Sequence, residues 1–363
     1  MKKHPDNLLL GLSITLIIGG LFILASVSAS LSQEKFGDVY YLLRRQIIMG
    51  LLPGLFLGFL AYKISLSFVK KWSFPLLLGS LLLLGLVFVP GLGISSGGAT
   101  RWINFGFFAF QPSEFFKLSF FLYLAAWLAG KEKKYKNLAA TLIPFFVIIG
   151  IATILIYVQP NISTLGIILI TALIMYFCSG TPWWQSALMF SGSVAFFAIL
   201  MKTASYRISR ISTFLNPNAE PMGLGYQIKQ ALIGIGSGGI AGLGLGMSRQ
   251  KFGFLPEPIG DSIFAVFAEE TGFIGASILI IIFLLFAWRG FKIIKASNDK
   301  FSSLLATGIV SWLTFQAFIN IGAMIRIVPL TGIPLPFISY GGSALVVELI
   351  AVGLLLNISK NTN

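Results

Sequence analysis

Long apolar stretches alternate with short polar gaps along almost the whole chain. Stretches such as residues 8–24, 74–89 and 274–288 are apolar on every side of a helix rather than along one stripe, which is typical of helices surrounded by lipid. The pattern predicts an all-α, polytopic membrane protein with about ten transmembrane helices. The spanning candidates fall at roughly 8–31, 46–62, 74–89, 113–129, 138–157, 161–179, 183–201, 261–288, 301–323 and 340–358.

Composition strengthens this prediction. Of the 363 residues, 56% are hydrophobic and only 10% are charged, whereas soluble domains carry about a quarter charged residues. The chain is expected to form a single membrane domain over residues 1–363. Its first apolar stretch follows Lys2 and Lys3, so a cleaved signal peptide is an alternative. Because that stretch is longer than the roughly 7 to 15 residues of a signal peptide core, we expect a retained first span.

The basic residues gather in alternate gaps, which is the positive-inside pattern. A net charge of +14 therefore indicates membrane orientation and not a nucleic-acid partner. The pattern predicts that both termini are cytoplasmic and that the longest gap, about residues 202–260 between the seventh and eighth spans, is extracytoplasmic. The basic residues of the predicted inner gaps are Lys63, Lys70, Lys71, Lys131, Lys133, Lys134, Lys136, Arg289, Lys292, Lys295 and Lys300.

The long gap has two parts. It begins with Lys202, Arg207 and Arg210 and becomes glycine-rich, and residues 234–246 are apolar but too short for an ordinary span. We expect residues 234–246 to be a re-entrant or interfacial segment that covers a cavity, because irregular backbone at membrane depth needs protein or water to satisfy it.

The scarcity of histidine and cysteine argues against several kinds of active site. The chain has one histidine, His4, in the leading tail and one cysteine, Cys178, in an apolar run. Histidine base catalysis, cysteine nucleophiles and Cys/His metal cages are therefore not expected.

The first candidate group surrounds Arg101 and the start of the fourth span. Pro112 and Ser113 favour a helix start, and Glu114 and Lys117 then share one face of its first turn. One interpretation is a cationic lining for an anionic lipid headgroup. The alternative is that Lys117 reaches to the headgroups and Arg101 is an interfacial anchor.

The second candidate group begins at Asp261, at the start of the eighth span. This aspartate could cap the helix or act in catalysis. Glu269 and Glu270 lie about two turns deeper, where a carboxylate is costly unless it is paired or used. Structural pairing and catalysis both remain open for these glutamates.

The third candidate group contains three prolines and three glycines between Pro329 and Gly342. This composition predicts a fixed, non-helical outer loop. Arg326 precedes the loop. Glu348 follows it as a further buried carboxylate without an assigned role.

Together these segments resemble the SEDS family of cell-wall glycosyltransferases, whose members include FtsW, RodA and SpoVE. The resemblance extends from about the second span to the tail, and the run Gly244–Lys251 looks closer to FtsW than to RodA. The motifs that carry it are Arg101-Trp102-Ile103, Gln111–Glu114, Gly225-Tyr226-Gln227, Leu255-Pro256-Glu257 with Asp261, and Gly332–Ser343.

The chain departs from the family pattern near the aspartate. The family usually has His and Thr shortly before the key aspartate, where this chain has Ile259 and Gly260, and a Phe after it, where this chain has Ser262. Asn161–Ser163 differ from the usual Asp-Leu-Gly, and Arg326 stands where glycine is common. The aspartate itself is kept as Asp261, so activity is expected.

The resemblance implies polymerisation of lipid II at the outer face of the bacterial plasma membrane, for septal wall synthesis. It implies Asp261 as the base that accepts a sugar hydroxyl proton, and cations that stabilise the departing pyrophosphate. No cofactor is required by the sequence, although a divalent cation (Mg²⁺ or Mn²⁺) could share the charge. The candidate substrate-binding residues are Arg101, Glu114, Lys117, Lys251 and Arg326.

Other functions fit the same residues. A lipid II flippase would use the same cavity and cations, a RodA-like enzyme would serve elongation, and a division scaffold would not need Asp261. The resemblance also implies a class B penicillin-binding transpeptidase and other divisome proteins as partners.

Overall fold

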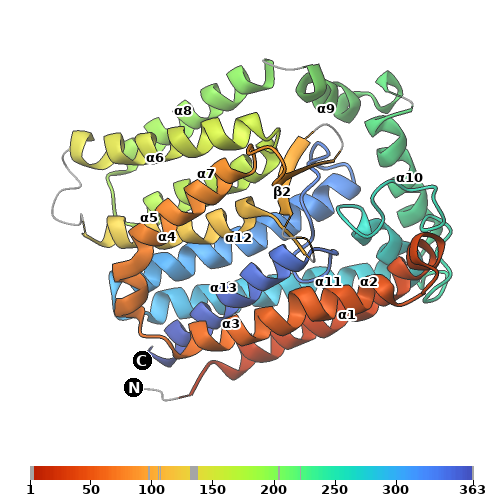
Figure 1. The fold of residues 1–363 in the computed structure, drawn as a ribbon, viewed down its shortest axis with the longest axis horizontal. Helices are drawn as coiled ribbons and strands as arrows, with labels where there is room; N and C mark the ends of the chain where they lie inside the picture. The colour runs from red at the N-terminus through yellow and green to blue at the C-terminus, as the bar shows by residue number, and fades with distance from the viewer. Residues whose placement is uncertain are drawn as a thin grey trace.

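Ten long helices form a bundle with roughly aligned axes in the computed structural model, which describes residues 4–96, 99–104, 106, 108–130, 138–202, 205–220 and 222–361 (Figure 1). Each of the ten predicted ranges overlaps one of these helices, so the prediction of an all-α polytopic membrane protein is confirmed. The helices are α1 (Asn7–Phe36), α3 (Leu52–Lys63), α4 (Leu66–Leu86), α5 (Pro112–Gly130), α6 (Leu138–Val158), α7 (Ile162–Cys178), α8 (Trp183–Lys202), α11 (Ile263–Ala296), α12 (Lys300–Met324) and α13 (Gly342–Lys360).

Seven helical segments in the described part of the chain are long and apolar enough to cross a membrane. They are Asn7–Phe36, Tyr41–Lys63, Leu66–Leu86, Trp183–Leu200, Ile263–Ala296, Lys300–Met324 and Gly342–Lys360. The second joins α2 (Tyr41–Gln46), the π-helical turn η1 (Ile47–Leu51) and α3. Phe145–Val158 and Ile162–Cys178 are apolar but shorter.

Helix α12 forms the centre of the bundle. It packs against α5, α7 and α11, and 78% of its most apolar window is buried. In contrast, only 22% of the corresponding window of Tyr41–Lys63 is buried, and its large side chains face outward. Polar groups on α12 are therefore held inside protein, where each needs a partner.

A small antiparallel sheet, which the sequence did not predict, lies in the half of the molecule away from the termini (Figure 1). Its strands are β1 (Gly93–Ser96), β2 (Ala99–Asn104) and β3 (Ala109–Phe110), in that order. Ile94 pairs with Trp102, and Ile103 pairs with Phe110. Arg101 and Trp102 thus belong to a strand and not to an irregular loop.

The long segment between α8 and α11 is largely structured. It contains α9 (Ser205–Leu215), the short 3₁₀ helix η3 (Pro217–Ala219) and α10 (Leu224–Ser237). Helices α9 and α10 lie at one end of the molecule, and both chain termini lie at the other (Figure 1).

The glycine-rich run closes a break in α11. Gly272 has φ +65° and ψ −166°. This break divides α11 into a short part that begins at Ile263 and a longer part that ends at Ala296. Leu243 N and Gly244 N donate to the carbonyls of Glu269 and Glu270, each at 3.0 Å. Phe273 N donates to Gly239 O at 2.9 Å, and Ile274 N to Ile240 O at 3.2 Å. The run therefore supplies the main-chain partners that the break removes.

Candidate functional site

Asp261 lies in the turn that leads into α11, half-buried and hydrogen-bonded to two polar side chains. Its Oδ1 accepts hydrogen bonds from Gln227 Nε2 at 3.3 Å and from Ser262 Oγ at 3.4 Å. Gln227 Nε2 also donates to Ser262 Oγ at 2.9 Å. The N-cap of α11 is Ser262, and no side chain caps this helix. Of the two interpretations of Asp261, the helix cap is therefore wrong.

The main chain on both sides of Asp261 is held by the proline-rich loop and by α12. Asn320 Nδ2 donates to Asp261 O and to Ile333 O, each at 2.7 Å. Ser339 Oγ donates to Gly260 O at 2.7 Å, and Tyr340 N donates to Ile259 O at 2.9 Å. Because the Ile259 contact uses only its main chain, it does not require the residue that the family usually has there.

The proline-rich loop is non-helical, as predicted, and buried side chains fix it. Gln316 Nε2 donates to Pro334 O at 3.0 Å. Glu348 accepts a hydrogen bond from Phe337 N at 2.8 Å, where Phe337 has φ +64°. This contact gives Glu348, which had no assigned role, a structural one.

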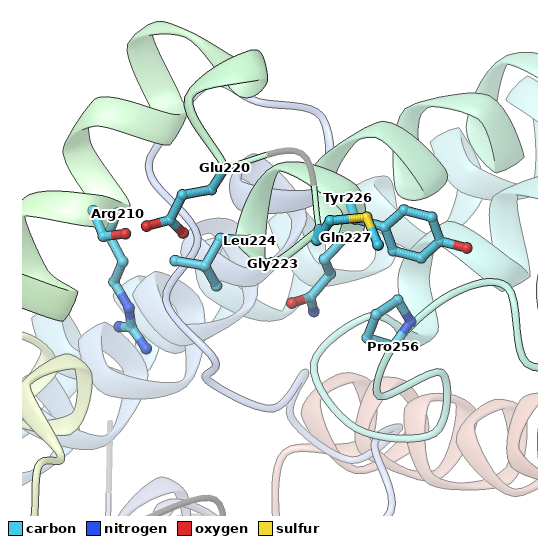
Figure 2. A pocket seen from close by; sticks show the side chains of 9 residues that line it. Arg210, Glu220, Gly223, Leu224, Tyr226, Gln227 and Pro256 are labelled. Carbon is cyan, nitrogen blue, oxygen red and sulfur yellow. The ribbon is translucent and has the colours of Figure 1, made fainter.

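A first cavity of about 640 Å³ lies beside Gln227. The cavity is lined by Arg210 of α9, by Gln227 of α10 and by Glu220 between η3 and α10 (Figure 2). Pro256, which also lines it, belongs to the segment that leads to Asp261. A Cβ atom added to Gly332 would lie 3.6 Å from Asp261 Oδ2 and 3.9 Å from Arg210 Nη2. The carboxylate and the guanidinium therefore flank the same glycine.

A second cavity of about 620 Å³ borders the same segment. Its walls include Glu257, Ile259 and Gly260, which immediately precede Asp261, together with Arg45 and Tyr340. Asp261 is thus adjacent to both cavities, since its partner Gln227 lines one and its neighbour Gly260 lines the other.

The environment of Asp261 favours a stronger base. Burial, which is the largest cause, and the nearby Glu257 charge raise the pKa of its carboxyl, the hydrogen bonds from Gln227 and Ser262 lower it, and together they move it from 3.8 to about 6. A carboxylate with this pKa is still mostly ionised at neutral pH and accepts a proton more readily than an ordinary aspartate.

Glu114 and Lys117 form the pair that their spacing predicted, but deep in the bundle. Lys117 Nζ lies 2.8 Å from Glu114 Oε2 and 2.9 Å from Gln316 Oε1, and 4.9 Å from the centre of the Trp312 ring. Lys117 is only 1% exposed. It does not extend to lipid headgroups, so that alternative is wrong. Its role toward a substrate stays a prediction.

The other predicted cations are each engaged by protein. Arg101 donates to Gln159 O and Pro160 O, and Arg326 donates to Phe214 O and Leu215 O. These contacts fix loops away from the chain termini (Figure 1). Neither Arg101 nor Arg326 is among the residues that line the two cavities.

Lys251 is buried beside the break in α11. Its Nζ lies 2.9 Å from Glu270 Oε1, and Ser26 Oγ donates to Glu270 Oε2 at 2.6 Å. Glu269 accepts hydrogen bonds from Ser248 Oγ, Arg249 N and Gln250 N. Structural pairing therefore describes both glutamates, and a phosphate-binding role of Lys251 stays a prediction that would require this pair to open.

The residues around Asp261 offer little to a divalent cation. Glu257 is the other carboxylate whose charge acts on Asp261, and the described residues contain no cluster of three His, Cys, Asp or Glu side chains suited to a metal.

Sequence reasoning missed Gln227, Asn320, Arg210 and Arg45 as site residues. Gln227 belongs to a motif noted in the sequence, but only the fold brings Gln227 and Asn320 to Asp261. Arg210 donates to Ser163 Oγ at 3.0 Å and to Thr331 O at 3.2 Å, so a residue that departs from the family pattern, Ser163, contacts a cavity arginine. The strongly amphipathic α9 was the available signal for Arg210.

Comparison with known proteins gives one consistent result. The family described as cell cycle protein (FtsW, RodA, SpoVE) matches residues 6–363. Stage V sporulation protein E of Bacillus subtilis (strain 168) is 38% identical over 99% of this chain and 98% of its own length. The probable peptidoglycan glycosyltransferase FtsW of Geobacter sp. (strain M18) is 37% identical over 98% of this chain and 96% of its own.

Solved structures agree. The chain superposes with a TM-score of 0.79 on a component of a peptidoglycan synthase complex, studied for the coordination of polymerization and crosslinking, with 27% identity over 98% of this chain and 97% of that one. It superposes on the rod shape determining protein RodA of Thermus thermophilus with a TM-score of 0.73 and 28% identity, over 99% and 97% of the two chains. The SpoVE relative, at 38% identity, is as similar to the chain as the FtsW relative, at 37%, so a particular closeness to FtsW stays a prediction.

Proposed function

The chain belongs to the FtsW/RodA/SpoVE family of cell cycle proteins, and from this membership we propose that it is a peptidoglycan glycosyltransferase that polymerises lipid II. The observation that carries the proposal is the position of Asp261, a carboxylate with a raised pKa whose partner Gln227 and neighbour Gly260 line one cavity each. A reaction between two lipid-linked saccharides needs room for both beside one base.

In the proposed step, Asp261 accepts the proton of a sugar hydroxyl on the acceptor. The hydroxyl oxygen forms a bond to the anomeric carbon of the donor, and the bond from that carbon to the pyrophosphate oxygen breaks. The lipid pyrophosphate leaves with the electron pair of that bond. General base catalysis of this kind contributes about 10²- to 10⁴-fold to a rate.

The arrangement of charge supports an extracytoplasmic site. Lys63, Lys70, Arg289 and Lys295 occupy helix ends or connections in the half of the bundle that holds the termini, whereas α9 and α10 lie at the opposite end (Figure 1). With the basic end in the cytoplasm of a bacterium, Asp261 and both cavities lie near the outer face of the plasma membrane.

We propose septal wall synthesis as the cellular role and a class B penicillin-binding transpeptidase as a partner. The similarity to FtsW proteins and to a subunit of a peptidoglycan synthase complex supports both. The sporulation relative is equally similar, so sporulation is the competing role. Depletion of the protein in growing cells distinguishes them, because a septal enzyme is needed for division and a sporulation enzyme is not.

The direct test is purified protein in detergent with lipid II, alone and with a class B transpeptidase. Formation of glycan strands, lost in Asp261→Asn, supports the polymerase. Movement of lipid II between leaflets of proteoliposomes without glycan formation would identify a flippase instead. Unchanged function of Asp261→Asn in cells would indicate a scaffold.

A further inference from the structure

Two adjacent arginines on α2 have different surroundings. Arg44 is exposed and pairs with Asp38. Arg45 is half-buried and lines the second cavity, and within the described residues it has no hydrogen bond or ion pair to a carboxylate or carbonyl. Glu257 also lines this cavity, but a guanidinium at a cavity wall that forms no ion pair with a protein carboxylate is suited to an anionic ligand.

The walls of this cavity combine three kinds of surface. Met49, Pro53 and Val346 belong to the apolar segments Tyr41–Lys63 and Gly342–Lys360, which are long enough to cross a membrane. Trp102 and Tyr340 add aromatic rings nearer the outer end. A ligand that fits has a hydrocarbon part, an anionic group near Arg45 and a polar part that can stack on aromatic rings.

The first cavity lacks this combination. Its walls come from α9, α10 and the segments beside them, and none of the residues given for it belongs to an apolar span. Arg210 in that cavity also already donates to Ser163 and Thr331. The first cavity therefore suits a water-soluble saccharide, and of these two cavities the second is the one whose walls combine residues of apolar spans with the residues next to Asp261.

We propose that the second cavity binds the pyrophosphate of a polyprenyl-linked saccharide and that Arg45 is its phosphate ligand. The proposal rests on the proposed function and names where one of the two lipid-linked substrates is held. Glu257, Ile259 and Gly260 form the wall that this site shares with the turn of Asp261, so a pyrophosphate at Arg45 places the attached sugar toward that carboxylate.

The test measures binding of undecaprenyl pyrophosphate to the full-length protein in detergent. Arg45→Gln should weaken binding by at least about tenfold, because a charge-assisted hydrogen bond is lost. Arg45→Lys should recover part of the affinity, since it keeps the charge without the fork. The matched control is Arg44→Gln, which removes the neighbouring charge outside the cavity and should bind like the wild type.

An Arg45→Gln protein that is stably folded and binds as tightly as the wild type would overturn the proposal. Equal loss in Arg44→Gln would also overturn it, because the effect would then be one of net charge. Displacement of the probe by phosphatidylglycerol at equal concentration would overturn it as well, since the cavity would then be a general phospholipid site.

Failure of this site and failure of the proposed function give different results. Wild-type protein that binds the probe through Arg45 but makes no glycan would refute the polymerase and support the site. Glycan formation by a protein whose probe binding ignores Arg45 would refute the site alone.

Discussion

The side-chain amide of Asn320 donates one hydrogen bond to the carbonyl of Asp261 and one to the carbonyl of Ile333, each at 2.7 Å. Asn320 is 1% exposed and lies on the central helix α12. A single side chain thus connects the turn of the proposed base to the proline-rich loop.

Replacement of Asn320 by alanine should therefore lower turnover while substrate affinity changes little. The substitution leaves two carbonyls without their partner, at a cost of about 1–3 kcal/mol for each group that stays buried, and we expect kcat to fall about ten- to hundredfold. The control is Asn357→Ala, because Asn357 donates to Ala61 O and Ile64 O in the same way on α13. If Asn357→Ala loses as much thermal stability as Asn320→Ala but keeps near-normal turnover, the loss in Asn320→Ala comes from the displaced turn of Asp261 and not from lower stability. Equal loss of turnover in both variants would contradict the prediction.

Asp261→Asn should lower the rate of polymerisation about 10²- to 10⁴-fold. The amide keeps nearly the same shape and its carbonyl oxygen can still accept a hydrogen bond from Gln227, so the fold should be retained. Glycan formation and thermal unfolding are measured together. Normal polymerisation by the folded variant would exclude Asp261 as the base.

The acid limb of the pH–rate profile should report the pKa of Asp261, which is raised to about 6. The base must be ionised, so the rate should be half-maximal near pH 6 and fall about tenfold per pH unit below it. Glu257→Gln removes a charge that raises this pKa and should move the limb to lower pH, whereas Gln227→Leu removes a hydrogen bond that lowers it and should move the limb to higher pH. Identical limbs in all three proteins would assign the titration to another group.

Lys117→Met should lower activity at least tenfold, or about 1.4 kcal/mol of transition-state stabilisation. It also leaves Glu114 charged and unpaired in the bundle, at a cost of about 3–5 kcal/mol. The double variant Lys117→Met with Glu114→Gln separates the two effects, because it removes the unpaired charge. Recovery of stability without activity would support a role toward substrate, and recovery of both would make Lys117 purely structural.

A cysteine at Asn218, in a Cys178→Ser background, should react with a membrane-impermeant maleimide in intact cells whose outer barrier is absent or permeabilised. Asn218 is exposed in η3, beside α9 and α10, while the native Cys178 is also exposed and must be removed. Asn298, exposed between α11 and α12 at the basic end, is the matched position that should label only after lysis. The reverse labelling pattern would overturn the proposed orientation.

The spans could be predicted from the sequence because lipid requires long apolar helices whatever their neighbours. The start of α4 at Leu66 was missed, since Lys70 and Lys71 look like a gap although the helix continues through them. The small sheet was missed because its strands are too short to show periodicity.

Asp261 could be named from its motif, but its partners could not. Gln227 is 34 residues away in sequence and Asn320 is 59 residues away, so only the fold brings them together. For the cations, the residues could be named from the sequence but their surroundings were predicted wrongly. Their charge indicated substrate binding, whereas the structure pairs Lys117 and Lys251 with buried glutamates, and no local pattern reveals a partner such as Gln316, 199 residues from Lys117.

The break in α11 at Gly272 has a consequence for inherited variation. The contacts across it are made by main-chain atoms, while Ile240 and Leu245 between them are about three-quarters exposed. A Cβ at Gly242 would lie 2.2 Å from Glu270 O, and one at Gly238 would lie 2.3 Å from Ala268 O. A scan of every single substitution should therefore find these glycines as intolerant as Asp261 although they touch no substrate, with freely exchangeable apolar residues beside them. Intolerance to mutation in this protein consequently marks two different things, chemistry at the turn and geometry one helix segment away.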